Sequence, residues 1–360
     1  GEAMVRGLAG KVSAVYSAFA ADAFIGDVTP RLEPLELKAR IRAMSEGLRR
    51  YLPADYPQAV SILLATLGPE LTLEEGMFNE GWFVLPIAQF VEDYGLDHFD
   101  VSLDAMVEIT KRNTAEFAVR PYIVRDAERV LARLREYVDH PNAHVRRWVS
   151  EGTRPRLPWG QRLDVFIRDP QPTLALLEQL KDDPELYVRK SVANHLNDIA
   201  KDHPELVAEV AARWYASGSE GTRWIVRHGL RTLIKRGDPA ALAILGYDVG
   251  AAVTAAHFAV QPETIRVGDS LRLALTLSND GADEHDVVID FRVHFVKANG
   301  KSSPKVFKWT TRRLAAGESI MLEKSVPLKP VTTRRYYPGW HAIDVQVNGQ
   351  VLATSGFTLV

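Results

Sequence analysis

The chain has 360 residues, 46% of them apolar, so it can bury the cores of two or three ordinary globular domains. It contains no cysteine, which excludes disulfide bonds, thiolate zinc sites and cysteine-ligated iron–sulfur clusters. No apolar run approaches the ~20 residues that span a bilayer, and the first residues lack the basic-then-apolar order of a secretory signal. We therefore expect a cytoplasmic protein.

Residues 8–245 read as an all-helical region, because their apolar residues recur at helical spacing between Pro-containing turns. A Val-Arg-x-x-apolar signature occurs four times within it, at offsets of 26, 43 and 38 residues, beginning at Val119, Val145, Val188 and Val226. Offsets near forty are typical of stacked helix pairs of the HEAT kind. The sequence predicts a HEAT-like solenoid over residues 1–250.

From Phe258 onward the apolar period changes to two, as in the alternating leucines of residues 271–277 and the alternating apolar residues of 289–295 and 343–347. Asn299-Gly300 and Asn348-Gly349 favour tight hairpin turns. About seven strands fit into this length. We expect an immunoglobulin-like β-sandwich over residues 251–360, with residues 246–257 as the junction.

The net charge of −2 hides a basic segment. Residues 297–335 hold ten Lys and Arg residues against two Glu residues. This segment either faces a polyanion or is a solvated strand and loop surface. We form the hypothesis that it grips DNA on the side away from the solenoid, so that the duplex is encircled and bent.

Two acidic residues in the repeats are candidates for chemistry. Glu151 lies three residues after Trp148, on the same helix face, and just before the expected helix end at Gly152. A carboxylate there opposes the helix dipole by roughly 0.3–1 kcal/mol, which Arg154, Arg156 and Trp159 of the next segment could offset. The alternative is a surface Glu paired with a nearby Arg.

In the third repeat, Asp198 falls on a helix face distinct from the apolar stripe, so it is expected to look outward. If successive repeats stack in register, it approaches Glu151 across one concave surface. The fourth repeat places an aromatic residue and three basic ones at helical spacing: Trp224, Arg227, Arg231 and Lys235. That pattern also fits an amphipathic helix with a solvated face.

Carboxylates bordered by guanidiniums and indoles suit the cleavage of a glycosidic bond. The sugar becomes positively charged as the bond breaks, and carboxylates stabilise that charge and orient water. Arginine and lysine can hold phosphates, and aromatic faces can stack on a sugar or base.

These residues resemble the HEAT-like-repeat alkylpurine DNA glycosylases, the AlkC/AlkD superfamily. The likeness covers roughly residues 8–245 and rests on segments similar to the AlkC branch at 116–121, 145–152, 155–159 and 194–204. The C-terminal region is similar to the immunoglobulin-like domain of some AlkC proteins.

The resemblance implies removal of cationic N-alkylated bases, 3-methyladenine and 3-methylcytosine, from duplex DNA without base flipping. We expect a monomer that needs no metal or other cofactor. Glu151 and Asp198 would be catalytic. The DNA-binding residues would be three indoles against the lesion and five basic side chains against the backbone: Trp148, Trp159, Trp224, Arg154, Arg156, Arg189, Arg227 and Lys235.

The sequence departs from the AlkD branch in one way that affects the assignment of site residues. In the AlkD branch the catalytic carboxylate is an Asp four residues after a Trp, whereas Glu151 follows Trp148 by three. We also expect Arg120 and Arg146 to be structural, because such arginines often bridge neighbouring helical repeats.

Two other functions remain open on the residues alone. Helical repeats are most often scaffolds, so a non-catalytic protein that binds DNA or another protein is the main alternative. A hydrolase acting on free glycosides is the other. Acidic residues within a basic and aromatic surface favour the enzyme, since a DNA-binding scaffold gains nothing from carboxylates beside phosphates.

Overall fold

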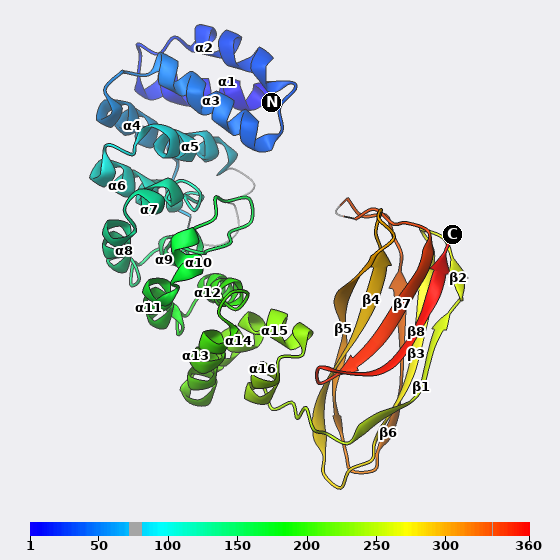
Figure 1. Cartoon of the computed structure of the whole chain (residues 1–360). Helices are drawn as coiled ribbons and strands as arrows, with labels where there is room; N and C mark the ends of the chain where they lie inside the picture. The colour runs from blue at the N-terminus through cyan, green and yellow to red at the C-terminus, as the bar shows by residue number, and fades with distance from the viewer. Residues whose placement is uncertain (72–80, 333) are drawn as a thin grey trace. The chain divides into compact units, whose positions relative to one another are not determined.

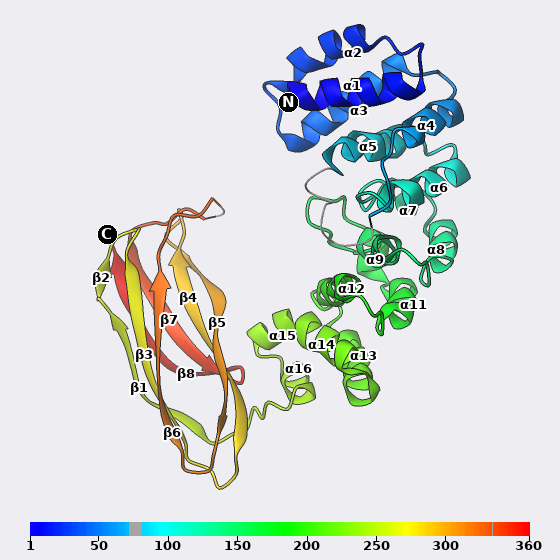
Figure 2. The ribbon, with the colours of Figure 1, turned by 180° about the vertical axis from the view of Figure 1, so that it is seen from behind.

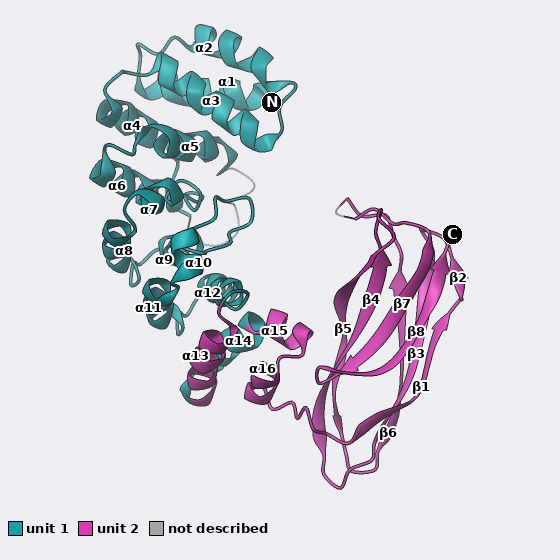
Figure 3. Ribbon diagram, viewed as in Figure 1, with its two compact units in different colours: residues 1–202, 217–229 teal, residues 203–216, 230–360 magenta. Residues whose placement is uncertain are grey.

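The computed structural model describes residues 1–71, 81–332 and 334–360. It divides into two compact units, one comprising residues 1–202 and 217–229 and the other residues 203–216 and 230–360 (Figure 3). The change from helices to strands lies between Ile244 and Val253. An all-helical region followed by a β-sandwich is the fold class that the sequence predicts, and it is confirmed.

The described part of the first unit consists of helices and the segments between them (Figure 1). In chain order they are α1 (Glu2–Val15), α2 (Ala21–Val28), η1 (Thr29–Leu32), α3 (Leu37–Tyr51), α4 (Tyr56–Ala65), η2 (Gly81–Phe83), α5 (Val84–Tyr94), α6 (Phe99–Thr110), α7 (Arg120–Arg125), α8 (Ala127–Arg135), α9 (Ala143–Gly152), α10 (Asp164–Arg168), α11 (Gln171–Leu180), α12 (Leu186–Ile199) and α14 (Glu220–Gly229).

The helices of this unit stack in the order of the chain, as both views show (Figures 1 and 2). Helix α3 packs on α5, α5 on α6, α6 on α9, α9 on α12 and α12 on α14. The four Val-Arg signatures fall at α7, α9, α12 and α14, and their valines are completely buried. The signature therefore marks the core that successive repeats share.

The second unit contains three helices, α13 (Pro204–Ser217, of which the last residue lies outside the unit), α15 (Arg231–Arg236) and α16 (Pro239–Ile244), followed by the strands. The strands are β1 (Val253–Gln261), β2 (Thr264–Ile265), β3 (Ser270–Asn279), β4 (His285–Val296), β5 (Ser302–Leu314), β6 (Ser319–Pro327), β7 (Gly339–Val347) and β8 (Gln350–Leu359). The first strand begins five residues before Phe258, where the alternating pattern begins.

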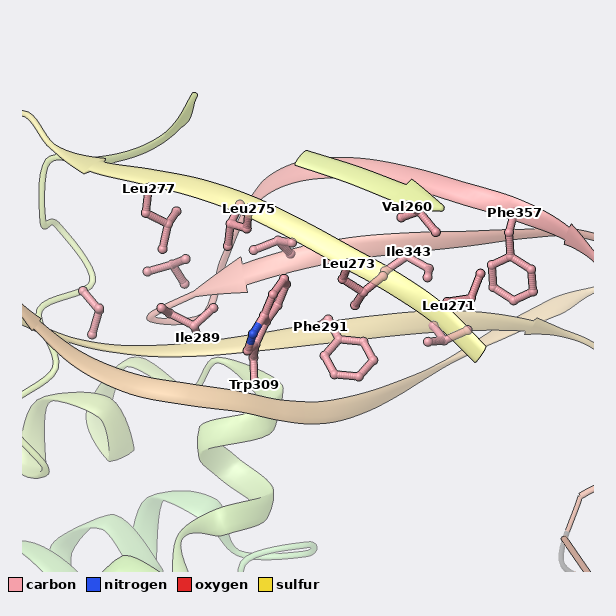
Figure 4. Packing of buried hydrophobic residues seen from close by; sticks show 14 of the residues in the cluster. Val260, Leu271, Leu273, Leu275, Leu277, Ile289, Phe291, Trp309, Ile343 and Phe357 are labelled. Atoms are coloured by element: carbon pink, nitrogen blue, oxygen red, sulfur yellow. The ribbon is translucent and has the colours of Figure 1, made fainter. Parts of the chain in front are cut away.

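The strands form a three-stranded sheet, β1-β3-β6, and a five-stranded sheet, β2-β8-β7-β4-β5. Every pairing is antiparallel except that of β2 with β8. The alternating residues predicted to face inward, such as Leu273, Phe291 and Ile343, pack between the two sheets (Figure 4). Asn348 and Gly349 adopt φ angles of 44° and 83°, as a tight hairpin turn requires.

Candidate active site

Helices α9 and α12 position the two carboxylates that the sequence singles out. Asn142 caps the start of α9 by accepting a hydrogen bond from the backbone nitrogen of His144 at 2.9 Å. Glu151 lies in the last turn of α9, and Asp198 lies in the last turn of α12. Since α9 and α12 pack side by side, their C-terminal ends bring the two carboxylates to the same place.

A single guanidinium joins the two carboxylates. Nη1 of Arg154 donates to Oε1 of Glu151 at 2.6 Å, and Nε of Arg154 donates to Oδ2 of Asp198 at 2.8 Å. All three side chains are buried. The expected approach of Glu151 and Asp198 is therefore present, but the expectation that Asp198 looks outward is wrong, because the loop after α9 folds over it and supplies the cation.

Further groups complete the hydrogen bonding of the pair. Oε2 of Glu151 accepts from the hydroxyl of Ser191 at 2.6 Å, and Oδ1 of Asp198 accepts from Nζ of Lys201 at 2.8 Å. A second guanidinium lies near the oxygen that Arg154 contacts: Nη2 of Arg147 is 3.6 Å from Oε1 of Glu151. Arg147 in turn donates to Glu116 at 2.6 Å.

The charges alternate along this chain of contacts, which we call the carboxylate network; it comprises Glu116, Arg147, Glu151, Arg154, Asp198 and Lys201. Burial alone would raise the pKa of Glu151. Arg147, Arg154 and the hydroxyl of Ser191 outweigh burial, so the pKa of Glu151 is lower than its ordinary value. Glu151 is therefore an anion at neutral pH, as the stabilisation of a sugar cation requires.

Arg120 fixes the loop that carries Arg154. Its guanidinium donates to the carbonyl oxygens of Gly152, Arg154 and Gln161 at 2.9, 2.8 and 2.6 Å. Arg146 bridges two repeats by donating to Asp183 at 2.6 Å. The structural roles predicted for Arg120 and Arg146 are confirmed.

His195 lies on α12 near Arg154, Asp198 and Glu151 of the network, and it is completely buried. Its Nδ1 lies 3.0 Å from the carbonyl oxygen of Ser150, and its Nε2 makes no hydrogen bond to any described residue. Burial, together with repulsion from Arg154, lowers the pKa of His195 to about 4. The imidazole is therefore neutral at physiological pH and adds no charge behind the carboxylates.

The two predicted DNA-binding tryptophans of the second repeat and its following loop differ in their exposure to solvent. The indole of Trp148 is completely buried, so in this structure it has no surface to offer a nucleotide. Trp159 is 75% exposed and has a φ of 64°, which is rare for a residue with a side chain. Nζ of Lys38 donates to the carbonyl oxygen of Trp159 and helps to hold this conformation.

Three predicted phosphate-binding arginines have partners within the protein. Arg154 belongs to the carboxylate network. Arg156 pairs with both oxygens of Asp202, at 2.8 and 2.7 Å. Arg189 donates to the carbonyl oxygens of Asp183 and Pro184 at 2.7 Å and so closes the turn before α12.

The fourth-repeat stripe does not lie on one helix. Helix α14 ends at Gly229 and α15 begins at Arg231, so a single helix carrying all four residues is a wrong prediction. A Cβ at Gly229 would lie 3.0 Å from Cδ2 of Leu196, so glycine allows α14 to pack closely on α12. Trp224 stacks on His228 with ring centroids 5.1 Å apart.

Two other members of the stripe are exposed cations: Arg227 pairs with Glu220 on α14, and Lys235 lies on α15 of the second unit. The last member, Arg231, is half-buried at the start of α15.

Three network residues were missed as site residues from the sequence: Glu116, Arg147 and Lys201. The spacing of Arg147 and Glu151, four residues apart on one helix, was a usable signal for Arg147. Glu116 has no comparable signal, because its partner Arg147 is 31 residues away in the chain.

A cavity of about 500 Å³ adjoins the network in the first unit, and Glu116 and Arg147 form part of its wall. The rest of the wall comes from α3, the segment 82–92, residues 113–118 and the loop residues Pro158 and Trp159. Its mostly apolar lining contrasts with the charged network beside it.

Among the described residues, no cluster of His, Asp or Glu side chains is arranged to hold a metal ion. Across the same ranges, no helix has both the length and the apolar composition to cross a membrane.

Comparison with known proteins identifies the family. Residues 97–233 match the family described as DNA alkylation repair enzyme, and residues 254–360 match the C-terminal Ig-like domain of uncharacterised protein YhaZ. The uncharacterised protein YhaZ of Bacillus subtilis is 38% identical over 353 residues, covering 97% of this chain and 95% of the relative.

A solved structure extends the likeness to the whole fold. The Pseudomonas fluorescens alkylpurine DNA glycosylase AlkC, bound to DNA containing an abasic site analog, has a TM-score of 0.93 and 37% sequence identity. The match covers 100% of this chain and 98% of that protein. The chain therefore belongs to the DNA alkylation repair enzymes, as a DNA glycosylase of the AlkC type.

Proposed function

We propose that this glycosylase removes cationic N-alkylated bases, 3-methyladenine and 3-methylcytosine, from duplex DNA and so initiates base excision repair. The observation that carries the proposal is the meeting of Glu151 and Asp198 on Arg154, at 2.6 and 2.8 Å. A base with a formal positive charge leaves without being protonated. The enzyme then needs anions near the sugar and a positioned water, which two carboxylates supply.

The proposed reaction breaks the bond between C1′ and the base nitrogen. The bonding electron pair moves to the base, which departs neutral, and the sugar acquires oxocarbenium character. The oxygen of a water molecule bonds to C1′, and one of its protons passes to a carboxylate. Glu151 and Asp198 share the tasks of stabilising the cation and orienting that water.

The lesion stays stacked in this proposal, so no base-flipping pocket is required. Trp159 is the indole proposed to pack on the lesion nucleotide; its exposure and the contact of Lys38 with its carbonyl oxygen support this role. Trp148 instead is completely buried, and its ring centroid lies 6.2 Å from that of Tyr137. Arg156, Arg189, Arg227 and Lys235 remain the proposed backbone contacts, and the first three would exchange internal partners for phosphates.

The sandwich supplies a second proposed DNA contact. A groove of about 510 Å³ on it is lined by four cations, Lys297, Lys305, Arg334 and Arg335, together with aromatic residues. The guanidinium of Arg334 lies 3.9 Å from the centre of the Phe295 ring. Cations beside aromatic rings suit a nucleic-acid backbone. The proposed active form is a monomer acting on chromosomal DNA.

The test is release of methylated bases from duplex DNA by the native chain, Glu151→Gln and Asp198→Asn. Each variant should lose at least about tenfold in rate, roughly 1.4 kcal/mol of barrier, and still bind DNA. Glu128→Gln, at an exposed position on α8, is the matched control. No release by the native chain from any methylated substrate would favour the non-catalytic scaffold.

A further inference from the structure

The oxygens of Glu151 and Asp198 differ in their partners. Both oxygens of Asp198 accept from cations, Oδ2 from Arg154 and Oδ1 from Lys201, each at 2.8 Å. Oε1 of Glu151 accepts from Nη1 of Arg154 at 2.6 Å, and Nη2 of Arg147 lies 3.6 Å from the same oxygen. Within the part of the chain that the structure describes, Oε2 of Glu151 is the one oxygen of the pair without a cation partner.

Ser191 supplies the hydrogen bond to this oxygen. Its Oγ lies 2.6 Å from Oε2 of Glu151 and 2.9 Å from Oγ of Ser150. A hydroxyl group has one proton, so Ser191 donates to one of these acceptors at a time. The carboxylate oxygen is nearer and charged, and charge-assisted hydrogen bonds are roughly twice as strong as neutral ones. The proton of Ser191 therefore goes to Oε2.

The carboxylate of Glu151 is held from two sides. Arg154, in the loop after α9, binds Oε1, while Ser191, on α12 and 40 residues away from Glu151 in the chain, binds Oε2. Glu151 and Ser191 are both buried. The last torsion of a glutamate side chain is broad and roughly two-fold. One hydrogen bond to each oxygen therefore fixes the plane of the carboxylate.

Oε2 is the oxygen best suited to the attacking water. An ionised carboxylate has about four acceptor sites, two on each oxygen. Ser191 occupies one site of Oε2, which leaves the other for a water molecule. As the bond between C1′ and the base breaks, with its electron pair passing to the base, the water oxygen bonds to C1′ and gives up a proton. The charge on Oε2 is the least compensated by cations, so Oε2 attracts that proton most strongly.

We propose that Ser191 is a positioning residue for base release, whose hydroxyl orients Glu151 so that Oε2 accepts first a hydrogen bond and then a proton from the attacking water. The inference rests on the proposed function and deepens it, because it assigns the water to one carboxylate oxygen. Asp198, with both oxygens held by cations, then stabilises the sugar cation.

The ionisation of Glu151 gives a readout of this contact. Burial raises the pKa of Glu151, and Arg147, Arg154 and the hydroxyl of Ser191 together bring the pKa below its ordinary value. Loss of the hydroxyl removes a hydrogen bond to the charged form, so it raises the pKa of Glu151. The rate of base release should then begin to fall at a higher pH as the solution is acidified.

The other charged groups around Glu151 do not produce such a difference. The pKa of His195 is about 4, so the imidazole is neutral above about pH 5. The remaining groups come from α7, α9, α12 and the segments beside them, and a substitution at Ser191 removes none of their ion pairs or backbone contacts: Arg120, Arg147, Arg154, Asp198, Lys201 and Glu116.

The experiment measures release of 3-methyladenine from duplex DNA under single-turnover conditions between about pH 5 and 8, with spontaneous release subtracted. It compares the native chain with Ser191→Ala, Ser191→Thr and Ser150→Ala. Ser191→Thr keeps the hydroxyl. Ser150→Ala is the matched control, because it removes the neighbouring buried hydroxyl but leaves the bond to Oε2. Thermal unfolding and binding to a duplex with an abasic-site analog are measured for each variant.

We expect Ser191→Ala to release the base about tenfold more slowly than the native chain at neutral pH, since a hydrogen bond to a charged group is lost. Its rate should fall at least about threefold further on acidification to about pH 5, where the native rate stays level. Ser191→Thr should recover most of the rate, and Ser150→Ala should keep the native pH profile. Binding of the abasic-site duplex should match the native chain in every variant.

Two results would overturn this inference alone. One is a native rate and pH profile in Ser191→Ala. The other is an equal loss in Ser191→Ala and Ser150→Ala at every pH, which means that the two hydroxyls only fill the core. If Ser191→Thr does not fold, the comparison of the two alanine variants decides. A native chain that releases no methylated base at any pH contradicts the proposed function, and the inference fails with it.

Discussion

Arg154 and Asp198 are 44 residues apart in the chain, yet Nε of Arg154 lies 2.8 Å from Oδ2 of Asp198. The same guanidinium contacts Glu151, so one buried cation separates two buried anions. Folding the loop after α9 onto α12 therefore does two things at once. It assembles the carboxylates, and it neutralises the repulsion that would otherwise oppose their assembly.

The first prediction concerns the stability that Arg154 contributes. Arg154→Ala leaves two carboxylates buried without their shared cation, which should reduce the free energy of unfolding by about 3–5 kcal/mol. Arg156→Ala, which breaks the partly exposed pair with Asp202, should cost less than about 1 kcal/mol. Denaturant unfolding of both variants at pH 7 makes the comparison. Equal losses would mean that the network does not stabilise the loop.

The second prediction concerns pH and His195. The folded protein has a pKa of about 4 at His195, below the ordinary value of about 6.5 expected in the unfolded chain. Between these values the unfolded chain binds more protons, so stability should fall as the pH is lowered through this window. The full difference corresponds to roughly 3 kcal/mol.

His195→Gln removes this titration and should flatten the dependence of the unfolding free energy on pH between about 5 and 6.5. Ionised Glu151 also stabilises the folded protein. This contribution is lost at lower pH, as the pH falls through the lowered pKa of Glu151. A slope that is the same in the native chain and in His195→Gln would contradict the assignment.

The sequence was sufficient to locate the repeat helices, but it could not show which of their side chains are exposed to solvent. The Val-Arg signature located α7, α9, α12 and α14, since buried valines recur wherever neighbouring repeats share a core. The same helical period placed Trp148 and Glu151 on one face, but it could not tell that the indole is enclosed. Enclosure depends on what other segments cover, which periodicity within one helix does not encode.

Ion pairs between distant segments could not be predicted from the sequence either. Arg147 and Glu116 lie 31 residues apart, and no spacing rule connects them. Helical spacing also carried the fourth-repeat stripe past Gly229, because a glycine inside a periodic pattern does not by itself end a helix. The close approach of Leu196 on α12 explains the glycine, and it is a property of the packed pair of helices.

The third prediction separates the two tryptophans. Trp148→Ala should lower the unfolding free energy by about 3–5 kcal/mol, because it removes a completely buried indole. Trp159→Ala should change stability by less than about 0.5 kcal/mol and weaken binding to lesion-containing duplex by about 1–3 kcal/mol, since a base–aromatic contact is lost.

Thermal unfolding and titration of labelled duplex measure the two effects for each variant. Trp159→Phe keeps an aromatic ring on the loop and should retain most of the binding. If Trp159→Ala binds DNA as tightly as the native chain, the exposed indole does not contact the lesion nucleotide.

The last prediction concerns the basic groove of the sandwich. Lys305→Ala combined with Arg335→Ala removes two cations from its wall. If both contact phosphates, the slope of log affinity against log salt should become shallower by roughly 2, since each phosphate contact contributes about 0.9 to that slope. Arg313→Ala is the control, because Arg313 lies in the same basic segment but pairs with Asp286 at 3.0 Å. An unchanged salt slope in the double variant would remove the sandwich groove from the proposed DNA interface, whereas a change of the same size in Arg313→Ala would mean that the whole segment attracts DNA without a defined groove.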